Sequence, residues 1–302
     1  MSDPAPAPAA PADPAPAPAP APAVARVRSR RARWYRQPTL MVGLVLLAII
    51  VFMCYGAPLL TSYNPDTQNL LEPLAGIGQY GHLLGTDQEG RDTWARLLYG
   101  GQVDLRVAGL AVLFPFILGI IVGSLAGYFG GWVDAIIMRI IDIVVAFPFF
   151  VLVIALVFVL GTGEKSIYIA ITAVGWVSYA RITRGEITVA KRQEYVLAAQ
   201  SGGLSSLRII GRHLLPNVVT QSIVYAMSDI VQDILAIVTL SYLGLGIQPP
   251  TADWGTMIAD GQNFLTTQWW LTTIPGLAVV ITGVALSLIG DGLADLLRPA
   301  SS

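Results

Sequence analysis

The stretch TLMVGLVLLAIIVFMCYGAPLL, residues 39–60, contains 22 residues and no charged side chain. A helix rises about 1.5 Å per residue, so about 20 apolar residues are enough to cross the ~30 Å hydrocarbon layer of a bilayer. An uncharged apolar run of this length is longer than a core helix of a water-soluble domain requires. The stretch therefore predicts a transmembrane helix and indicates that the whole chain is a membrane protein.

The composition supports this interpretation. Charged residues make up 12% of the 302 residues, against about 25% in soluble domains, and hydrophobic residues make up 54%. The 18 basic and 19 acidic residues give a net charge of −1, so we expect no nucleic-acid partner. A single cysteine, Cys54, excludes an internal disulfide and a cysteine-based metal site. The two histidines, His82 and His213, are too far apart for a zinc motif of the HExxH type.

The sequence contains no recognisable catalytic constellation. A phosphate-binding GxxxxGK[ST] loop is absent, and the nearest string, residues 161–166, lacks the first glycine at the required spacing. There is no GxSxG motif, and the carboxylates show no spacing typical of an acid–base pair. We therefore expect a non-catalytic chain that holds no metal and no cofactor of its own.

Five further segments are long and apolar enough to span a membrane. Their continuous hydrophobicity favours helices over the alternating strands of a membrane barrel. The predicted fold class is an all-α integral membrane protein with six transmembrane helices. The six spans are Thr39–Leu60, Val107–Tyr128, Ala135–Leu160, Ile167–Val189, Val218–Gly244 and Leu271–Ile289.

Two features of the spans predict how the helices bend and pack. A proline within a helix removes a backbone hydrogen bond, so kinks are expected in the second, third and sixth spans. The second span also has a small residue at every fourth position, which lets a neighbouring helix approach closely. Packing within the chain is the favoured interpretation of this stripe, and a contact between subunits is the alternative. The prolines are Pro115, Pro148 and Pro275, and the stripe is Gly119, Gly123 and Gly127.

Basic residues set the orientation of the spans. An arginine cluster precedes the first span, and such clusters remain on the cytoplasmic side. An even number of spans then places both termini in the cytoplasm, loop 61–106 outside and loop 190–216 inside. Loop 190–216 is itself basic, as this orientation requires. The arginines of the cluster are Arg26, Arg28, Arg30, Arg31, Arg33 and Arg36.

The chain divides into three parts along its length. Residues 1–36 form an Ala/Pro-rich and then basic cytoplasmic tail, which we expect to be disordered or polyproline-like. A compositionally biased extension is the favoured interpretation of this tail, and a partner-binding ligand is the alternative. Residues 37–101 are expected to contain the first span and the external loop. Residues 102–298 are expected to form the main transmembrane domain.

Loop 190–216 predicts two short helices joined by an elbow. The first helix is expected to end at the glycine pair 202–203, and Ser205 is a candidate N-cap for the second. Pro216 is expected to interrupt the second helix before the fifth span begins. One face of this second helix is predicted to be apolar, with Leu207, Ile210 and Leu214. Two interpretations remain open from the residues alone: a rigid peg held by a partner protein, or an interfacial helix lying on lipid headgroups.

The spacing of Ala198, Ala199, Gly203, Leu215 and Pro216 resembles the EAA motif of permease subunits in bacterial ATP-binding-cassette importers. Leu197 stands where the motif has its leading glutamate. Seven further stretches resemble the C-type permease of the dipeptide/oligopeptide/nickel transport family, and the resemblance covers roughly residues 36–298. The stretches are residues 84–92, 96–100, 126–134, 138–142, 240–250, 254–255 and 290–293.

The resemblance implies a type I importer fold in the bacterial cytoplasmic membrane and a defined set of partners. These are a homologous second permease, two ATPase subunits that bind ATP and magnesium, an extracytoplasmic substrate-binding protein and membrane lipid. Tyr242, Gln248 and Trp254 would then lie near the substrate entrance or the contact with the binding protein. The residues implied to couple this chain to the ATPases are Glu194, Ala198, Ala199, Gly203, Leu207, Arg208, Leu215 and Pro216.

Two acidic residues of the fifth span, Asp229 and Asp233, share one helix face because they are four positions apart. A charge at membrane depth costs roughly 2.5–3.5 kcal/mol on the insertion scale, so such residues usually face a cavity, a cation or a partner. One hypothesis is that they line the translocation path and favour substrates with an ammonium group. In the alternative, Arg139 or a residue of the second permease pairs with them.

The function predicted from the sequence is that of a membrane-spanning subunit in an ATP-driven importer of dipeptides or oligopeptides. Nickel complexes, opines or oligosaccharides are alternative cargoes within the same family. A gradient-driven secondary transporter is the less favoured alternative, because such transporters usually contain inverted repeats and none is evident in this sequence.

Overall fold

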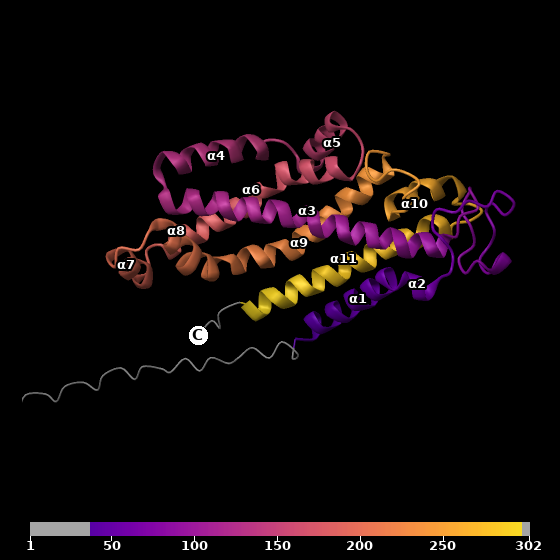
Figure 1. Cartoon of the computed structure of the whole chain (residues 1–302), viewed down its shortest axis with the longest axis horizontal. Coiled ribbons are helices and arrows are strands. Elements are labelled where there is room, and N and C mark those ends of the chain that lie inside the picture. The colour runs from indigo at the N-terminus through magenta and orange to yellow at the C-terminus, as the bar shows by residue number, and fades with distance from the viewer. Residues whose placement is uncertain (1–36, 298–302) are drawn as a thin grey trace, which may run out of the picture. The chain divides into compact units, whose positions relative to one another are not determined.

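The computed structural model describes residues 37–297, and most of these are in helices (Figure 1). The tail predicted for residues 1–36 lies outside the described residues. A single bridge between Thr86 and Asp92 is the extended pairing in the described part of the chain. The helices are α1 (Pro38–Tyr55), α2 (Ala57–Leu60), η2 (Gln79–Gly81), α3 (Thr93–Phe129), α4 (Gly131–Val145), α5 (Phe149–Leu160), α6 (Glu164–Ala190), α7 (Glu194–Ser201), α8 (Ser206–Ile209), η3 (Ile210–Leu214), α9 (Leu215–Tyr242), α10 (Trp254–Gly261), η4 (Gln262–Phe264) and α11 (Trp270–Leu297).

Four continuous helical segments among the described residues are long and apolar enough to cross a membrane: α1, α3, Ser206–Tyr242 and α11. The bent pair of α4 and α5 makes a fifth if it counts as one span. Helix α6 occupies the predicted fourth span, and its 27 residues extend roughly 40 Å. It is less apolar than the other spans. A less apolar helix can lie in the membrane here because one side of α6 packs on α3 and another on α9, so that much of its surface contacts protein.

The predicted third span, Ala135–Leu160, is not one continuous helix. It divides at residues 146–148, and α4 and α5 meet at an angle of 88°. Pro148 lacks an N–H and disfavours helical geometry at the preceding residue, so the chain turns there instead of kinking. At the other two predicted kinks, α3 continues through Pro115 and α11 continues through Pro275.

The glycine stripe of α3 packs against α6 of the same chain, as the favoured interpretation predicted. A Cβ atom at Gly123 would lie 2.9 Å from the Ala180 Cα, and one at Gly127 would lie 2.9 Å from the Arg184 carbonyl oxygen. Both distances are shorter than van der Waals contact. The missing side chains therefore allow the two backbones to approach each other, and α3 and α6 form the most extensive helix pair in the described structure.

The Gly123→Ala substitution is expected to destabilise the protein by roughly 1–3 kcal/mol, because the new methyl group forces α3 away from α6. Gly109 on the same helix supplies a matched control, since a Cβ there would have no atom within 4 Å. Gly109→Ala should be neutral or stabilising by up to about 1 kcal/mol through helix propensity. Thermal unfolding of both variants in detergent measures the difference, and equal melting temperatures would contradict the close-packing argument.

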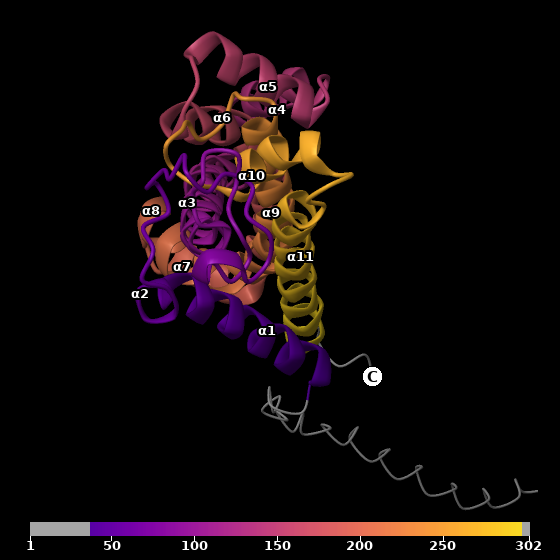
Figure 2. The same cartoon turned by 90° about the vertical axis from the view of Figure 1, so that its right-hand side faces the viewer.

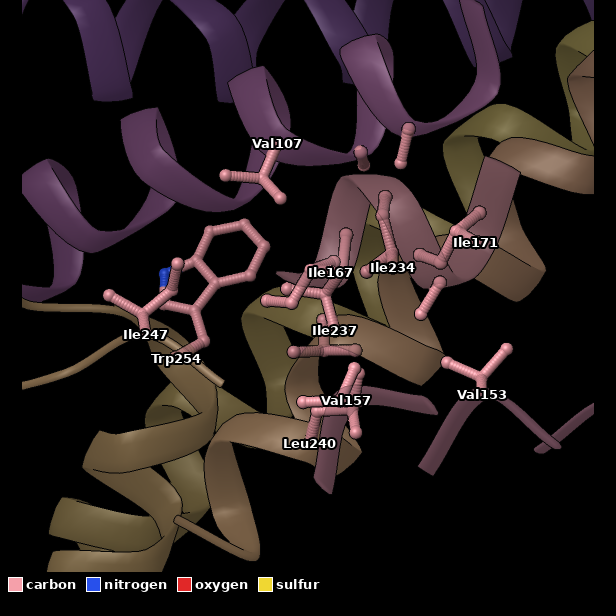
Figure 3. Packing of buried hydrophobic residues seen from close by; sticks show 14 of the residues in the cluster. Val107, Val153, Val157, Ile167, Ile171, Ile234, Ile237, Leu240, Ile247 and Trp254 are labelled. Atoms are coloured by element: carbon pink, nitrogen blue, oxygen red, sulfur yellow. The ribbon is translucent and has the colours of Figure 1, made fainter. Parts of the chain in front are cut away.

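The main core lies where α3, α5, α6, α9 and α10 meet (Figure 3). Val107 of α3, Ile167 of α6 and Ile237 of α9 belong to the same buried cluster as Trp254, and Val107 lies beside the Trp254 ring. Val153 and Val157 of α5 also point into this core, so α5 covers the α6–α9 pair in spite of the bend before it. Helix α3 crosses the boundary expected at residue 101. The expected segments 37–101 and 102–298 are therefore joined by one continuous helix.

Candidate functional site

The elbow predicted after α6 is present; it consists of residues 191–214 and connects α6 to α9. Helix α7 (Glu194–Ser201) is followed by a turn in which Gly203 has a φ of +74°, a left-handed conformation that favours glycine. Ser205 occupies the N-cap position of α8 (Ser206–Ile209), although its side chain makes no capping hydrogen bond. The glycine turn and the two short helices confirm the local structure predicted from the sequence.

Pro216 does not interrupt the chain as predicted. A π-helical turn, η3 (Ile210–Leu214), connects α8 directly to α9, and Pro216 lies in the first turn of α9. The wider π turn also changes the predicted apolar face. Ile210 and Leu214 are buried, whereas Leu207 is 74% exposed.

A separate apolar cluster fixes the elbow to the bundle. Val196 of α7, Ile209 of α8 and Leu214 of η3 are buried against Ile187 of α6 and Val218 of α9. The elbow therefore contacts the end of one long helix and the beginning of the next. A force on α7 or α8 is transmitted to both α6 and α9, because a close-packed cluster of this kind deforms little.

The residues implied to couple the chain to ATPases divide into two groups. Ala199 and Leu215 are half-buried and pack on the cluster that fixes the elbow. The remaining six face outward. The exposed residues are Glu194, Ala198, Gly203, Leu207, Arg208 and Pro216.

Charged contacts next to the elbow were not predicted from the sequence. The Lys191 side chain donates hydrogen bonds to the carbonyl oxygens of Gly127 (2.8 Å) and Tyr128 (3.4 Å), at the C-terminal end of α3. Arg184 of α6 forms a two-pronged ion pair with Asp134 of α4. The partners are 50 or more positions apart, so no local spacing indicates them. Together these contacts join the ends of α3, α4 and α6 beside the elbow.

The carboxylates of Asp229 and Asp233 lie inside the chain, 6% and 1% exposed. The Tyr179 hydroxyl of α6 donates a hydrogen bond to Asp229 Oδ2 (2.7 Å). Within residues 37–297, Asp233 Oδ2 has no hydrogen-bond partner. Arg139 is exposed on α4, and among the ion pairs of the described residues none joins it to these carboxylates.

Tyr179→Phe is expected to destabilise the protein by about 1.5–3 kcal/mol, because it removes a hydrogen bond to a buried charged group while keeping the ring. Tyr168→Phe is the matched control: its hydroxyl also donates to a carboxylate, Glu164 (2.5 Å), but at a solvent-accessible site. Thermal unfolding should distinguish the two variants. If both variants lower the melting temperature equally, the buried Tyr179–Asp229 hydrogen bond contributes no more to stability than the solvent-accessible Tyr168–Glu164 bond.

The three residues predicted near the entrance lie in different environments. Tyr242 is exposed and its hydroxyl donates to Gln262 Oε1 (2.6 Å). The exposed Gln248 donates to the carbonyl oxygens of Gly244 and Gly246. Trp254 is a core residue, 1% exposed, and its indole N–H donates to the Leu97 carbonyl oxygen (3.0 Å). The place of Trp254 near the entrance stays a prediction, and its side chain forms part of the protein core.

The end of the bundle opposite the elbow contains α10 and the loop before α3 (Figures 1 and 2). Buried arginines connect them: Arg91 contacts both Asp87 (2.7 Å) and Asp260 of α10 (3.4 Å), and Arg96 contacts Asp87 (3.4 Å). Burial raises the pKa of the Asp260 carboxyl, and the two arginines partly oppose that rise. Asp87, Arg91 and Arg96 lie in stretches used for the resemblance, but their ion pairs were not predicted from the sequence.

Asp253 begins α10 and is also buried. Its carboxylate accepts backbone N–H bonds from Gly255 (2.9 Å) and Thr256 (3.1 Å), which makes it the N-cap of the helix. Burial raises the pKa of Asp253 in spite of these donors. The following N–H, of Trp254, donates to Asp104 of α3 (2.9 Å). The start of α10 is thus fixed to α3 by backbone and side-chain bonds.

Comparisons with known proteins identify the family. The model of the binding-protein-dependent transport system inner membrane component matches residues 119–302, and that of the N-terminal transmembrane domain of oligopeptide transport permease C matches residues 28–75. The dipeptide transport system permease protein DppC of Bacillus subtilis is 39% identical over 86% of this chain and 81% of its own. The oligopeptide transport system permease protein OppC of the same organism is 38% identical over 86% and 85%.

Two further comparisons agree. The di/tripeptide transport system permease protein DppC of Pseudomonas aeruginosa is 37% identical over 85% of this chain and 86% of its own. A chain of the MetNI methionine ABC transporter in an inward-facing conformation has a TM-score of 0.52 and 17% identity, covering 67% of this chain and 97% of that one, which supports the fold alone. The chain therefore belongs to the family of inner membrane components of binding-protein-dependent transport systems, and within it to the C-type permeases of the dipeptide/oligopeptide/nickel group.

Proposed function

We propose that this chain is one of two membrane-spanning subunits of an ATP-driven importer for peptides. The named relatives transport dipeptides, tripeptides or oligopeptides, and they match this chain over most of its length. The chain itself performs no chemistry in this proposal. It offers a substrate site alternately to each side of the membrane, while separate ATPase subunits bind and hydrolyse ATP.

The observation that carries the proposal is the elbow of α7 and α8. Leu207 is a large apolar side chain that protrudes from it, and Tyr195 and Leu197 are also exposed on the same short segment. Exposed apolar groups beside arginines are typical of a protein contact. Because the cluster of Val196 and Leu214 connects the elbow to α6 and α9, a partner that displaces the elbow would move both helices.

The orientation and the remaining partners follow from this assignment. The elbow and both termini lie in the cytoplasm, where the ATPases dock. The opposite end, with α10, lies outside and receives substrate from an extracytoplasmic binding protein near Tyr242 and Gln248. A homologous second permease completes the translocation path. The basic residues Arg192, Arg208 and Arg212 on the elbow support this orientation, since positive charge accumulates on the cytoplasmic side.

Uptake of a labelled dipeptide by cells that lack or contain this chain tests the function. The proposal predicts uptake that depends on the chain, stops when ATP is depleted and persists when an ionophore collapses the proton gradient. Cytoplasmic ATPase subunits should also co-purify with the chain in detergent. Uptake that follows the ion gradient instead of ATP would support a secondary transporter and contradict the proposal.

We further propose that Asp229 and Asp233 favour cationic substrates when the bundle opens. Both carboxylates are buried in this conformation, and Asp229 bonds to Tyr179 of α6, so a substrate can reach them only after the helices around α9 separate. Asp229→Asn and Asp233→Asn should reduce uptake of peptides with a free amino terminus more than uptake of N-acetylated peptides. Unchanged uptake of both substrates would exclude a role in the path and leave a structural one.

A further inference from the structure

An apolar groove of about 390 Å³ lies between α1, α3 and α11. Thirteen residues line it, and every one is apolar. Trp254 and Leu98 form part of its floor, Leu46 and Cys54 belong to the α1 wall, and Ala278 belongs to the α11 wall. Without polar partners in its walls, the groove is a poor site for ordered water. It therefore requires an apolar occupant.

The groove exists because α1 and α11 are in close contact at one end and separate at the other. At the close end, a Cβ on Gly43 would lie 2.8 Å from the Ala285 carbonyl oxygen, and one on Gly292 would lie 2.8 Å from the Leu40 Cα. Toward the end that carries α10, the contact opens into the groove, between residues 46–54 of α1 and 274–281 of α11. Figure 2 shows α1 at the edge of the bundle beside α11.

The rim of the groove indicates that it faces lipid. Ile49 of α1 and Leu277 and Ile281 of α11 are exposed beside further exposed aliphatic residues, Val45 and Val280. Helix–helix interfaces in membranes are enriched in small residues, whereas this rim consists of large aliphatic side chains. Helix α1 is also peripheral, since only 17% of its most apolar window is buried. These features favour a lipid chain over a helix of another protein.

We propose that the groove binds one acyl chain of a membrane phospholipid, which packs against Trp254 and so supports the start of α10. The chain would fill a space that otherwise leaves the lining residues without contacts on one side. Because α10 follows directly from Trp254, occupancy of the groove would stabilise the end of the bundle at which this helix lies.

The test compares a groove-filling variant with a matched control on the same helix. Ala278→Phe places a ring in the groove, and Val280→Phe adds a similar ring on the exposed face two positions away. The full-length chain is reconstituted in phosphatidylcholine with brominated acyl chains, which quench tryptophan fluorescence on contact. Trp94 and Trp254 both line the groove, so Ala278→Phe should reduce quenching, and Val280→Phe should quench as the unmodified chain does.

Native mass spectrometry of the detergent-purified chain provides a second readout. The unmodified chain and Val280→Phe should each retain one phospholipid more than Ala278→Phe. Ile50→Phe fills the groove from α1 and should behave as Ala278→Phe does. Lipid loss in both variants would not be explained by a folding defect in one of them. Equal lipid retention and equal quenching in all variants would overturn the proposal. Loss of a co-purifying permease from Ala278→Phe, with lipid retention unchanged, would assign the groove to a protein and also overturn it.

Discussion

Leu207→Asp is expected to abolish co-purification of the ATPase subunits and to reduce peptide uptake at least about tenfold, while the chain still folds. Leu207 is 74% exposed and makes no contribution to the cluster that fixes the elbow, so the substitution leaves that cluster intact. In the proposed complex its side chain lies in a groove of the ATPase. A desolvated apolar anchor of this kind contributes about 2 kcal/mol or more to binding, and each 1.4 kcal/mol corresponds to a factor of ten.

The same substitution at Leu59 provides the control. Leu59 is 82% exposed on α2, which follows the end of α1 opposite to Pro38, and in the proposed orientation it should not contact an ATPase. Leu59→Asp should leave co-purification of the ATPases unchanged. Retention of the ATPases by Leu207→Asp would show that the exposed elbow is not the docking element. Loss in both variants would point to a general effect of a new charge on the membrane protein.

The sequence predicts the spans well because the signal for a span is local. Residues 39–60 need no information from the rest of the chain to be recognised as a membrane helix. The bend at Pro148 was predicted only as a kink. Its 88° angle depends on the packing of Val153 and Val157 against α6 and α9, which no local pattern contains. The glycine stripe predicted close approach, and only the structure identifies α6 as the neighbour.

The elbow illustrates the same limit at the candidate site. Gly203 was correctly predicted as the turn because a left-handed backbone favours glycine wherever it occurs. The π turn at 210–214 was missed, and with it the exposure of Leu207, because burial of Ile209 and Leu214 against α6 and α9 selects that backbone geometry. The contact of Lys191 with the end of α3 joins residues 64 positions apart and has no sequence signal at all.

Substitution of Trp254 has the largest expected effect on stability. Trp254→Ala should destabilise the protein by about 3–5 kcal/mol, because it removes the largest fully buried side chain of the described residues and leaves a cavity. It also removes the indole hydrogen bond to the Leu97 carbonyl oxygen, which is one of the two hydrogen bonds that fix the start of α10 to α3. Unfolding in detergent, followed by circular dichroism, measures the loss.

Trp269→Ala supplies the comparison that separates burial from residue type. Trp269 is 55% exposed, and its ring lies edge-on to Trp270 with 6.3 Å between the ring centres. Its removal should cost about 1 kcal/mol or less. A similar decrease in the free energy of unfolding in both variants would mean that burial of Trp254 adds no particular stability to this end of the bundle. A large loss confined to Trp254→Ala would instead support α10 as a fixed part of the fold, held by the tryptophan that also forms part of the groove floor.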